Sequence, residues 1–522
     1  MRPEAETIPE LVRQRTKADG DRQALVADAA AVTYRELDEG SQALAARLVG
    51  AGVVKGDRVA LLAPNGVEWA GVALAGMRIG AVLVPLSTLL RPPELMTQLR
   101  TASVTHLILV PEFRQRSYLD DLDEAAPGLV AAARSGERHP VAPSLRRLWL
   151  LERLPDVAAS AAVVAALENR VCPADDLAIL FTSGSRGAPK GVVHTHGAAL
   201  RAVASGLDVR CIGRDERLYI PMPFFWTGGF GQGLLTVLVA GATMLTEAEP
   251  EPSRTLEFLV RERATLFRGW PDQAARLAAH PGFADVDLSA LRDGSLGAVL
   301  PTERRPLPGA RANLFGMTET FGPYCGDRLD LDLPQEKFGS CGRPFEGVEV
   351  RIVDPEARRE VARGGEGEIW LRGDNLLRGI CGRLRSSVFT EDGWYRTGDL
   401  GQLDEDGYLW SCGRRDDMVK IKGASVYPSE VETALRAVDG VSQAYVADVP
   451  DDSGRPQVAA LVVSDATIDA IRRSVRQRLS AFKVPTLWMV TPEADIVPML
   501  ASGKVDKSAL QALLAAEGGC GS

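Results

Sequence analysis

A short segment rich in glycine, hydroxyl and basic side chains is the clearest chemical feature of the sequence. It follows the apolar run Ala178–Leu180 and reads Thr-Ser-Gly-Ser-Arg-Gly-Ala-Pro-Lys-Gly over residues 182–191. Glycines let backbone N–H groups face phosphate oxygens, hydroxyls donate hydrogen bonds, and Arg or Lys neutralises negative charge. The spacing is not GxxxxGK[ST], so the P-loop NTPase motif is excluded. The segment predicts a triphosphate-binding loop, formed by Thr182, Ser183, Gly184, Ser185, Arg186, Gly187 and Lys190.

Five more motifs follow along the chain. They are Asn313-Leu-Phe-Gly-Met-Thr-Glu319, Gly393-Trp-Tyr-Arg-Thr-Gly-Asp399, Gly413-Arg-Arg-Asp416-Asp-Met-Val-Lys420, Pro428-Ser-Glu-Val-Glu432 and Ser502-Gly-Lys504. With the phosphate loop, these motifs resemble the adenylate-forming superfamily, in the family's order. That superfamily includes acyl-CoA synthetases, nonribosomal-peptide adenylation domains and luciferases. The resemblance extends from Thr33 to Leu510, and the sequence is closest in look to acyl-CoA synthetases.

The resemblance implies how the nucleotide is held. Phe315 stacks on adenine, Thr318 meets the α-phosphate and Glu319 holds Mg²⁺. Asp399 binds the ribose hydroxyls, and Arg414 lies at the ribose or the phosphates. Four further positions of the same motif are expected to contact ATP: Asn313, Leu314, Gly316 and Met317.

The resemblance also implies two catalytic lysines. Lys504 is expected to bridge the incoming carboxylate and the α-phosphate during adenylation, which needs preorganised cations because two anions approach each other. In the family a small domain then rotates about a hinge, here at Asp416, and presents the segment from Lys420 to Gly423 for acyl transfer. ATP, Mg²⁺ and CoA are the expected small-molecule partners.

The segment Pro221–Gly233 occupies the region of the family's acid pocket. Phe225, Trp226, Gly228 and Gly229, together with Met317, are its candidate residues. Residues 221–235 contain no acidic side chain, so a buried α-ammonium would lack a counter-ion. This argues against an α-amino acid and favours an apolar or aromatic acid, although such aromatic clusters are equally often plain core.

Two functions stay open at this point. The leading expectation is an ATP-dependent ligase that adenylates a carboxylic acid and transfers the acyl group to CoA. The alternative is a ligase of secondary metabolism that activates an unusual acid such as nitrite, or passes its adenylate to a carrier protein or an amine. The Pro- and Arg-rich interval between Gly294 and Phe315 looks shortened relative to the family, which keeps the alternative open. His194 and His196 follow the loop and are interpreted as structural, not as a catalytic base.

The elements that position these motifs alternate between helical and strand patterns. Helix-like residues 34–51 and 67–79 alternate with strand-like residues 58–62, 81–84 and 105–110, which predicts layered α/β structure around a largely parallel sheet. Residues 121–165 have weak periodicity and are interpreted as a surface connection, and residues 348–412 are rich in short β-like runs. We expect an α/β N-terminal domain with a β-rich subdomain (1–412), a hinge (413–416) and a small, mobile α+β C-terminal domain (417–522).

Composition excludes several other classes. A chain of 522 residues is too long for one hydrophobic core, and its net charge of −9 gives no reason to expect nucleic acid or an anionic membrane as a partner. Apolar runs are interrupted by charge, as at Arg78, so no membrane span is expected. The seven cysteines form no CxxC pair and the N-terminus lacks the pattern of a secretory signal. We therefore expect a cytoplasmic enzyme without zinc, as a monomer or homodimer.

Overall fold

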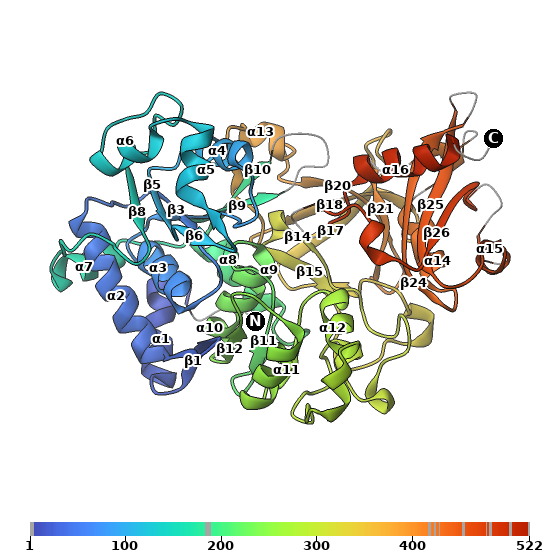
Figure 1. Cartoon of the computed structure of the whole chain (residues 1–522), viewed down its shortest axis with the longest axis horizontal. Helices are drawn as coiled ribbons and strands as arrows, with labels where there is room; N and C mark the ends of the chain where they lie inside the picture. Colours follow the sequence, from blue (N-terminus) through green and yellow to red (C-terminus); the bar gives the residue numbers. More distant parts are fainter. Residues whose placement is uncertain are drawn as a thin grey trace. The chain divides into compact units, whose positions relative to one another are not determined.

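The computed structural model separates the chain into two compact units (Figure 1). The residues that it describes are 5–182, 189–415, 419–421, 424–426, 428–451, 455–476, 478–479, 483–500 and 504–519. One unit comprises Met1–Glu349 with Arg372–Tyr395, and the other comprises Val350–Leu371 with Arg396–Ser522. None of the helices in the described ranges combines the length and apolar character needed to cross a bilayer.

The first unit contains a seven-stranded sheet. Its strands, in spatial order, are β19 (Gly379–Ile380), β10 (Lys190–Thr195), β9 (Asp176–Thr182), β4 (Val82–Pro85), β3 (Arg58–Leu62), β5 (His106–Leu109) and β8 (Arg147–Leu150). The pairs β9–β4, β4–β3, β3–β5 and β5–β8 are parallel, whereas β10 pairs antiparallel with both of its neighbours. The prediction of a largely parallel sheet is confirmed.

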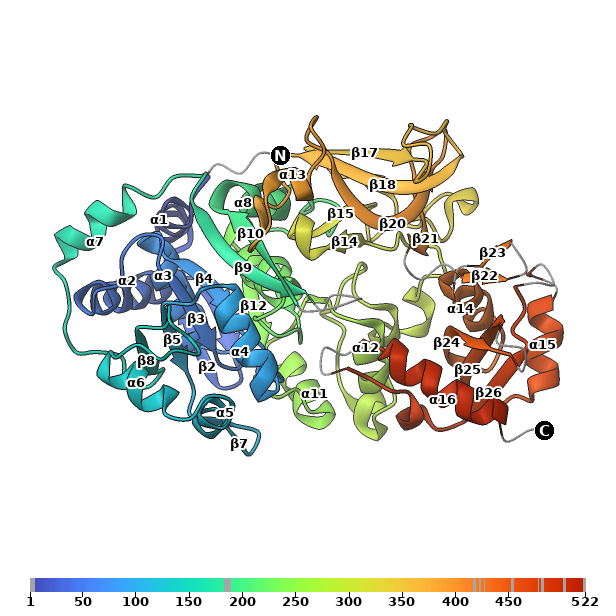
Figure 2. The same ribbon diagram turned by 90° about the horizontal axis from the view of Figure 1, so that it is seen from above.

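Alternating side chains of this sheet enter two separate cores. In β3, Val59 and Leu61 pack with α2 (Tyr34–Gly50) and α3 (Val67–Arg78), while Ala60 and Leu62 pack with helices of the opposite face. Those helices are α4 (Pro92–Thr101), α5 (Tyr118–Ala125) and α6 (Leu129–Ser135). Figure 2 shows α2 and α3 on the other side of the sheet from α5 and α6. A strand buried on both faces reads as a continuous apolar run, as β3 does.

A five-stranded sheet shares the first of these cores. Its order is β13 (Leu266–Phe267), β11 (Arg217–Tyr219), β12 (Thr243–Thr246), β1 (Gln23–Ala27) and β2 (Ala30–Thr33). Leu25 faces the core that contains α2 and α3, whereas Val26 faces α11 (Pro252–Arg261) and α12 (Pro271–Ala278). The two sheets and their helices are therefore stacked as successive layers.

The interpretation of residues 121–165 as a surface connection is wrong. This stretch holds the end of α5, all of α6, the edge strand β8 and the start of α7 (Ala161–Glu168). Leu129, Val130 and Leu148 are buried in the core beneath α4. The helices are only seven or eight residues long, which is too few turns for a clear 3.6-residue period, and α6 and α7 are also rich in alanine.

The shortened interval before Phe315 contains no long helix or strand. After Gly294 the described chain forms two short 3₁₀ turns, Gly297–Val299 and Thr302–Arg304, and then enters β14 (Phe315–Met317). β14 pairs antiparallel with β15 (Gly322–Gly326), which pairs with β16 (Arg343–Pro344). This small sheet carries the second predicted nucleotide motif.

The second unit combines two larger sheets. Most of the four-stranded sheet β17 (Val348–Val353), β18 (Glu366–Gly373), β20 (Tyr395–Leu403) and β21 (Leu409–Arg414) belongs to it. A three-stranded sheet follows, with β24 (Val441–Pro450), β25 (Pro456–Ser464) and β26 (Leu487–Thr491). The helices are α14 (Pro428–Arg436), α15 (Ile468–Arg476) and α16 (Lys507–Gly519). The α+β character expected for residues 417–522 is confirmed by the three-stranded sheet and these helices, and the β-rich character expected for residues 348–412 by the four-stranded sheet.

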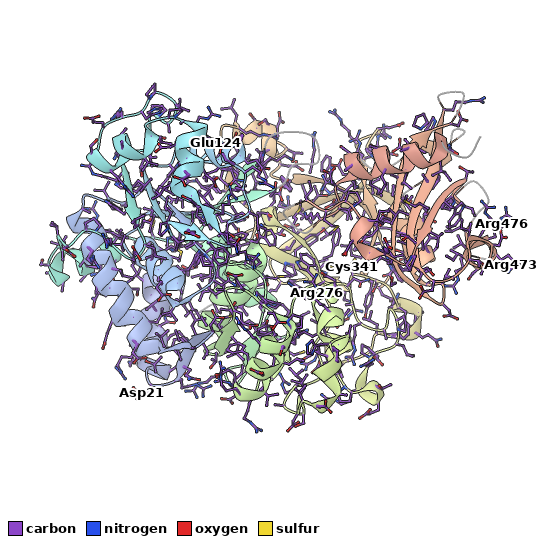
Figure 3. The ribbon with its side chains drawn as sticks, viewed as in Figure 1. Asp21, Glu124, Arg276, Cys341, Arg473 and Arg476 are labelled. Carbon is purple, nitrogen blue, oxygen red and sulfur yellow. The ribbon has the colours of Figure 1, made fainter. Side chains whose placement is uncertain are left out.

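Helix α15 shows how sequence pattern directs packing in this unit. Ile471 and Val475, four positions apart, are buried with α14 and one face of β25. Arg473 and Arg476 lie on the outer side of the helix (Figure 3). Because the two apolar side chains are four positions apart, they lie on one face of the helix, and this face packs against the sheet.

Candidate functional site

The ends of the predicted phosphate loop are held by a hairpin. β9 and β10 pair antiparallel, and Thr182 lies directly opposite Lys190. Because cross-strand partners share a face of a sheet, the hydroxyl and the ammonium group belong to the same side of the hairpin. Buried residues such as Leu180 and Val192 anchor the two strands in the sheet. The predicted positions Ser183, Gly184, Ser185, Arg186 and Gly187 lie outside the described residues.

The second nucleotide motif forms a strand and a tight turn. Phe315 and Met317 belong to β14, and Gly316 between them packs so closely that an added Cβ would lie 2.3 Å from the carbonyl oxygen of Gly322. Thr318 and Glu319 follow in a single 3₁₀ turn. The motif therefore requires glycine at position 316 because neighbouring backbone occupies the space of a side chain.

Phe315, the expected adenine-stacking residue, is half-buried. Its ring lies edge-on to that of Tyr324, with centroids 5.7 Å apart. Asn313 is exposed and its side-chain nitrogen donates to the carbonyl oxygen of Gly339 at 3.3 Å, while Leu314 is partly buried. β14 therefore carries an aromatic ring, that of Phe315, which packs edge-on against the ring of Tyr324.

Glu319 is almost fully buried, at 6% exposure. The Tyr395 hydroxyl donates to its Oε1 atom at 3.1 Å, and the Leu377 N–H donates to its carbonyl oxygen at 2.8 Å. The donor set fits Mg²⁺ delivered with a nucleotide, because Mg²⁺ is usually held by one or two carboxylates together with phosphate oxygens. Within the described residues, no three His, Cys, Asp or Glu side chains converge on a site of their own for a metal.

The predicted acid-pocket segment leads into a distorted helix. α9 (Thr227–Gly229) continues as a π-helical turn (Phe230–Leu235) and then as α10 (Thr236–Ala240). π-turns inside helices are frequent at functional sites. Gly228 and Gly229 are tightly packed: a Cβ on Gly229 would lie 2.2 Å from the carbonyl oxygen of Pro223.

The aromatic residues of this segment divide into two groups. Phe224 and Phe230 are fully buried and pack edge-on against Trp69, so these two rings are plain core. Phe225 is 5% exposed and Trp226 is partly exposed, with ring centroids 5.2 Å apart. Phe225 and Trp226 do not belong to this core packing against Trp69, so they remain the candidate aromatic residues of the acid pocket.

In the second unit, two predicted nucleotide residues form an ion pair. Asp399 of β20 lies opposite Arg414 of β21, and Arg414 Nη1 contacts Asp399 Oδ1 at 3.0 Å. The Asp399 side chain is largely buried and its backbone N–H donates to the Thr397 hydroxyl at 2.9 Å. The structure therefore brings together the two residues of this unit that the sequence predicts to bind the nucleotide.

The predicted catalytic lysines occupy separate parts of the second unit. Lys504 is exposed, and its carbonyl oxygen accepts the Leu500 N–H at 2.7 Å just before α16 begins. Lys420 lies in β22 (Val419–Ile421), opposite Ser425 of β23 (Ala424–Val426). Asp416, the predicted hinge, lies outside the described residues.

Both histidines after the phosphate loop are fully buried. Burial lowers the pKa of His194 and of His196 to about 4, so both rings are neutral near pH 7. His196 begins α8 (His196–Ser205), and its Nδ1 accepts the Ile8 N–H at 3.2 Å. His194 lies in β10 and its Nε2 contacts the Thr318 carbonyl oxygen at 2.8 Å. Neither is placed as a catalytic base, in keeping with the sequence interpretation.

Three residues of the site escaped the sequence argument. Tyr395 contacts Glu319, Gln232 of the π-turn donates to the Phe321 carbonyl oxygen at 2.8 Å, and Asn65 donates to the Met222 carbonyl oxygen at 3.0 Å. Tyr395 stands within the Gly393–Asp399 motif, which was a usable indication. Gln232 and Asn65 have no comparable pattern, because their contacts depend on folding over 89 and 157 positions.

Comparison with known proteins agrees with this geometry. Residues 12–381 match the AMP-binding enzyme family, and residues 430–504 match the AMP-binding enzyme C-terminal domain. A feruloyl-CoA synthase of an Amycolatopsis species is 33% identical over 91% of this chain and 93% of that protein. A long-chain-fatty-acid–CoA ligase of Mycobacterium tuberculosis is 30% identical over 96% and 97%. The structure of ATP-bound MatB from Rhodopseudomonas palustris matches with a TM-score of 0.74 at 26% identity, over 97% of this chain and 99% of that one.

An α/β architecture with a small C-terminal domain, a phosphate hairpin and an aromatic-Gly-Met-Thr-Glu turn defines an adenylate-forming ligase. The chain belongs to the AMP-binding enzyme family and is an adenylate-forming ligase of the acyl-CoA synthetase type.

Proposed function

We propose that this enzyme uses ATP to adenylate an apolar or aromatic carboxylic acid and then transfers the acyl group to CoA. The contact between β10 and the Glu319 turn carries the proposal. His194 of β10 and Thr318, 124 positions apart in sequence, are joined by a hydrogen bond. The strand that begins at Lys190 and the turn that carries Glu319 are therefore in direct contact. A site that binds one triphosphate through both elements requires such contact.

Adenylation joins a carboxylate oxygen of the acid to the α-phosphorus of ATP, and the bond to pyrophosphate breaks. In this proposal Lys190 and the preceding loop bind the β- and γ-phosphates, and Thr318 donates to the α-phosphate. Glu319 holds Mg²⁺, which when bound neutralises phosphate charge. Lys504 pairs with the incoming carboxylate and the α-phosphate, while Asp399 accepts from the ribose hydroxyls.

The character of the acid follows from the pocket candidates. Phe225 and Trp226 offer apolar ring surface, and the tight packing of Gly228 and Gly229 against Met222 and Pro223 fixes the backbone that follows these rings. Residues 221–235 supply no carboxylate for an ammonium group, and an unpaired buried charge costs several kcal/mol. The named relatives act on feruloyl and long-chain fatty acyl groups, which supports an apolar or aromatic acid.

CoA is the proposed acceptor because the named relatives are CoA ligases. We place the transfer step at the segment that contains Lys420, after rotation about Asp416. The relatives do not favour nitrite as the acid, or a carrier protein or an amine as the acceptor.

A pyrophosphate-release screen tests the proposal. Fatty, aryl, amino and inorganic acids are each supplied with MgATP, with and without CoA, and acyl-AMP and acyl-CoA are measured by mass spectrometry. We expect release with apolar or aromatic acids, acyl-AMP without CoA, and acyl-CoA with it. Removal of Mg²⁺ by EDTA should abolish release. A preference for α-amino or inorganic acids, or an adenylate that CoA does not consume, would refute the assignment.

A further inference from the structure

The turn that presents Glu319 is held through three of its backbone carbonyl groups. His194 Nε2 contacts the Thr318 oxygen at 2.8 Å, the Leu377 N–H donates to the Glu319 oxygen at 2.8 Å, and Gln232 Nε2 donates to the Phe321 oxygen at 2.8 Å. These donors come from β10, from the chain before β19, and from the π-turn. The turn is therefore fixed by three different parts of the fold.

The backbone of this turn needs external support. Phe321 has φ 56°, the left-handed conformation that a bulky residue rarely adopts, and Gly322 follows at φ 125°. The Phe321 ring is fully buried between His194 and Phe230, with centroid distances of 4.9 and 5.9 Å. A left-handed residue persists only where surrounding structure determines it, and here His194 supplies both a hydrogen bond and a ring contact.

The chemistry of the two groups decides which of them donates in the hydrogen bond between His194 and Thr318. A carbonyl oxygen only accepts, so Nε2 carries the hydrogen and donates. The ring is fully buried, and burial lowers its pKa to about 4, so it stays neutral under working conditions. The other nitrogen, Nδ1, is buried and has no hydrogen-bond partner among the residues that the structure describes. His194 is thus committed to one bond, the bond to Thr318.

We propose that His194 is a positioning residue that sets the distance between the phosphate hairpin and the Glu319 turn, and so controls how the enzyme uses MgATP. β10 begins at Lys190 and reaches His194 four residues later, so the same short strand ends the phosphate loop and holds the metal-binding turn. Loss of the bond would remove the direct side-chain link between β10 and the turn and leave the link through Leu377 and Arg378, whose N–H groups bond Glu319 and Val193. This inference rests on the proposed function, because it assigns Mg²⁺ to Glu319.

Substitutions at His194 test the role. His194→Gln keeps an N–H donor close to the position of Nε2, whereas His194→Leu removes it. The matched control is His196→Leu, because His196 is equally buried but contacts Ile8 of α1 (Ile8–Asp19) instead of the turn. The readouts are the Mg²⁺ concentration for half-maximal ATP–pyrophosphate exchange, KM for MgATP, KM for the acid, and the thermal midpoint.

We expect His194→Leu to raise both the Mg²⁺ requirement and KM for MgATP about tenfold, with little change in KM for the acid. His194→Gln should return both values to within about threefold of the wild type. His196→Leu should lower the thermal midpoint but leave the Mg²⁺ requirement and KM for MgATP unchanged. A wild-type Mg²⁺ requirement in His194→Leu, or an equal shift in His196→Leu, would show that His194 acts only in stability.

Two further measurements keep the inference independent of folding and of the choice of acid. Gln232→Met removes the donor to Phe321 at nearly constant length, and should shift the Mg²⁺ requirement in the same direction as His194→Leu. Calorimetric titration with ATP, with and without Mg²⁺, needs no turnover. If no acid supports exchange by the wild type, the proposed function fails. The positioning role then stands if Mg²⁺-dependent ATP binding is weakened by His194→Leu and kept by His194→Gln, and it fails if the three proteins bind alike.

Discussion

Three cationic side chains of this enzyme are the proposed partners of anions. Lys504 is exposed just before α16, Arg414 is held by Asp399 at 3.0 Å, and Lys190 begins β10 after the predicted phosphate loop. A lysine is a compact, strongly hydrated point charge on a flexible stem, suited to meeting a carboxylate and a phosphate together. An arginine fixed by a carboxylate presents its remaining N–H groups in one direction.

At this scale we expect Lys504→Ala to lower acid-dependent ATP–pyrophosphate exchange at least ~100-fold, because a cation that stabilises the transition state is lost. A supplied acyl-AMP should still be converted to acyl-CoA at a near wild-type rate. Lys507→Ala, an exposed lysine three positions away in α16, is the matched control and should leave both reactions unchanged. Equal loss of both half-reactions in Lys504→Ala would contradict the assigned role.

Tyr395→Phe is expected to weaken metal use, because the hydroxyl that contacts Glu319 Oε1 at 3.1 Å is removed while the ring is kept. We predict a rise of about tenfold to a hundredfold in the Mg²⁺ concentration for half-maximal exchange, the size of one lost hydrogen bond to a charged group. KM for the acid is the internal control. An unchanged Mg²⁺ requirement would show that the carboxylate is held by its other contacts.

At the scale of elements, close backbone packing positions the motifs. Gly316 in β14 and Gly229 in α9 both lie against neighbouring carbonyl groups, at 2.3 and 2.2 Å from an added Cβ. Such glycines are required by contact with backbone, which cannot move aside as a side chain can. The strand β14 therefore keeps its partner β15 only if residue 316 lacks a side chain.

We predict that Gly316→Ala lowers the free energy of unfolding by about 2–4 kcal/mol, because the added Cβ would take the space of the Gly322 carbonyl group and force β14 and β15 apart. Gly40→Ala is the control, because Gly40 is exposed in α2 and an added Cβ meets nothing within 4 Å. It should stabilise the protein by about 0.5–1 kcal/mol through helix propensity. Urea unfolding measures both changes, and equal stability of the two variants would show that β14 and β15 can separate without cost.

At the scale of the whole molecule, the proposed reaction cycle depends on motion between domains. The hinge predicted at residues 413–416 stays a prediction, because Asp416 lies outside the described residues. We expect Asp416→Pro, which restricts φ, to leave acyl-AMP formation within about threefold of wild type and to slow transfer to CoA at least ~100-fold. Single-turnover assays of each half-reaction measure this, and a matching loss of adenylation would remove the hinge role.

Buried histidines should make the stability of the molecule depend on pH. Burial lowers the pKa of His196 to about 4 in the folded state, below its ordinary value of 6.5. As pH falls, the unfolded chain binds the proton first, so this contribution is fully present above about pH 6.5 and is lost as the pH falls toward 4. Between pH 7 and 5 the loss is about 2 kcal/mol. Urea unfolding of His196→Gln should show a shallower pH dependence by that amount; parallel curves would contradict the assignment.

The sequence by itself determined the layered α/β fold, because short apolar runs such as residues 58–62 alternate with helical patterns. It also determined the enzyme class, because six motifs occur in one order. The nucleotide-binding roles that it assigned to the two motifs stay predictions. It misread residues 121–165, because short alanine-rich helices have too few turns to show a period.

Only the tertiary structure decided which residues hold the motifs in place. The bonds from His194 to Thr318, from Gln232 to Phe321 and from Tyr395 to Glu319 join positions 76–124 apart in the chain. Such contacts leave no local pattern, because a single hydrogen bond imposes no periodicity on the sequence. The burial of Phe224 and Phe230 in the core was decided in the same way, since burial depends on neighbours that the chain brings together only when folded.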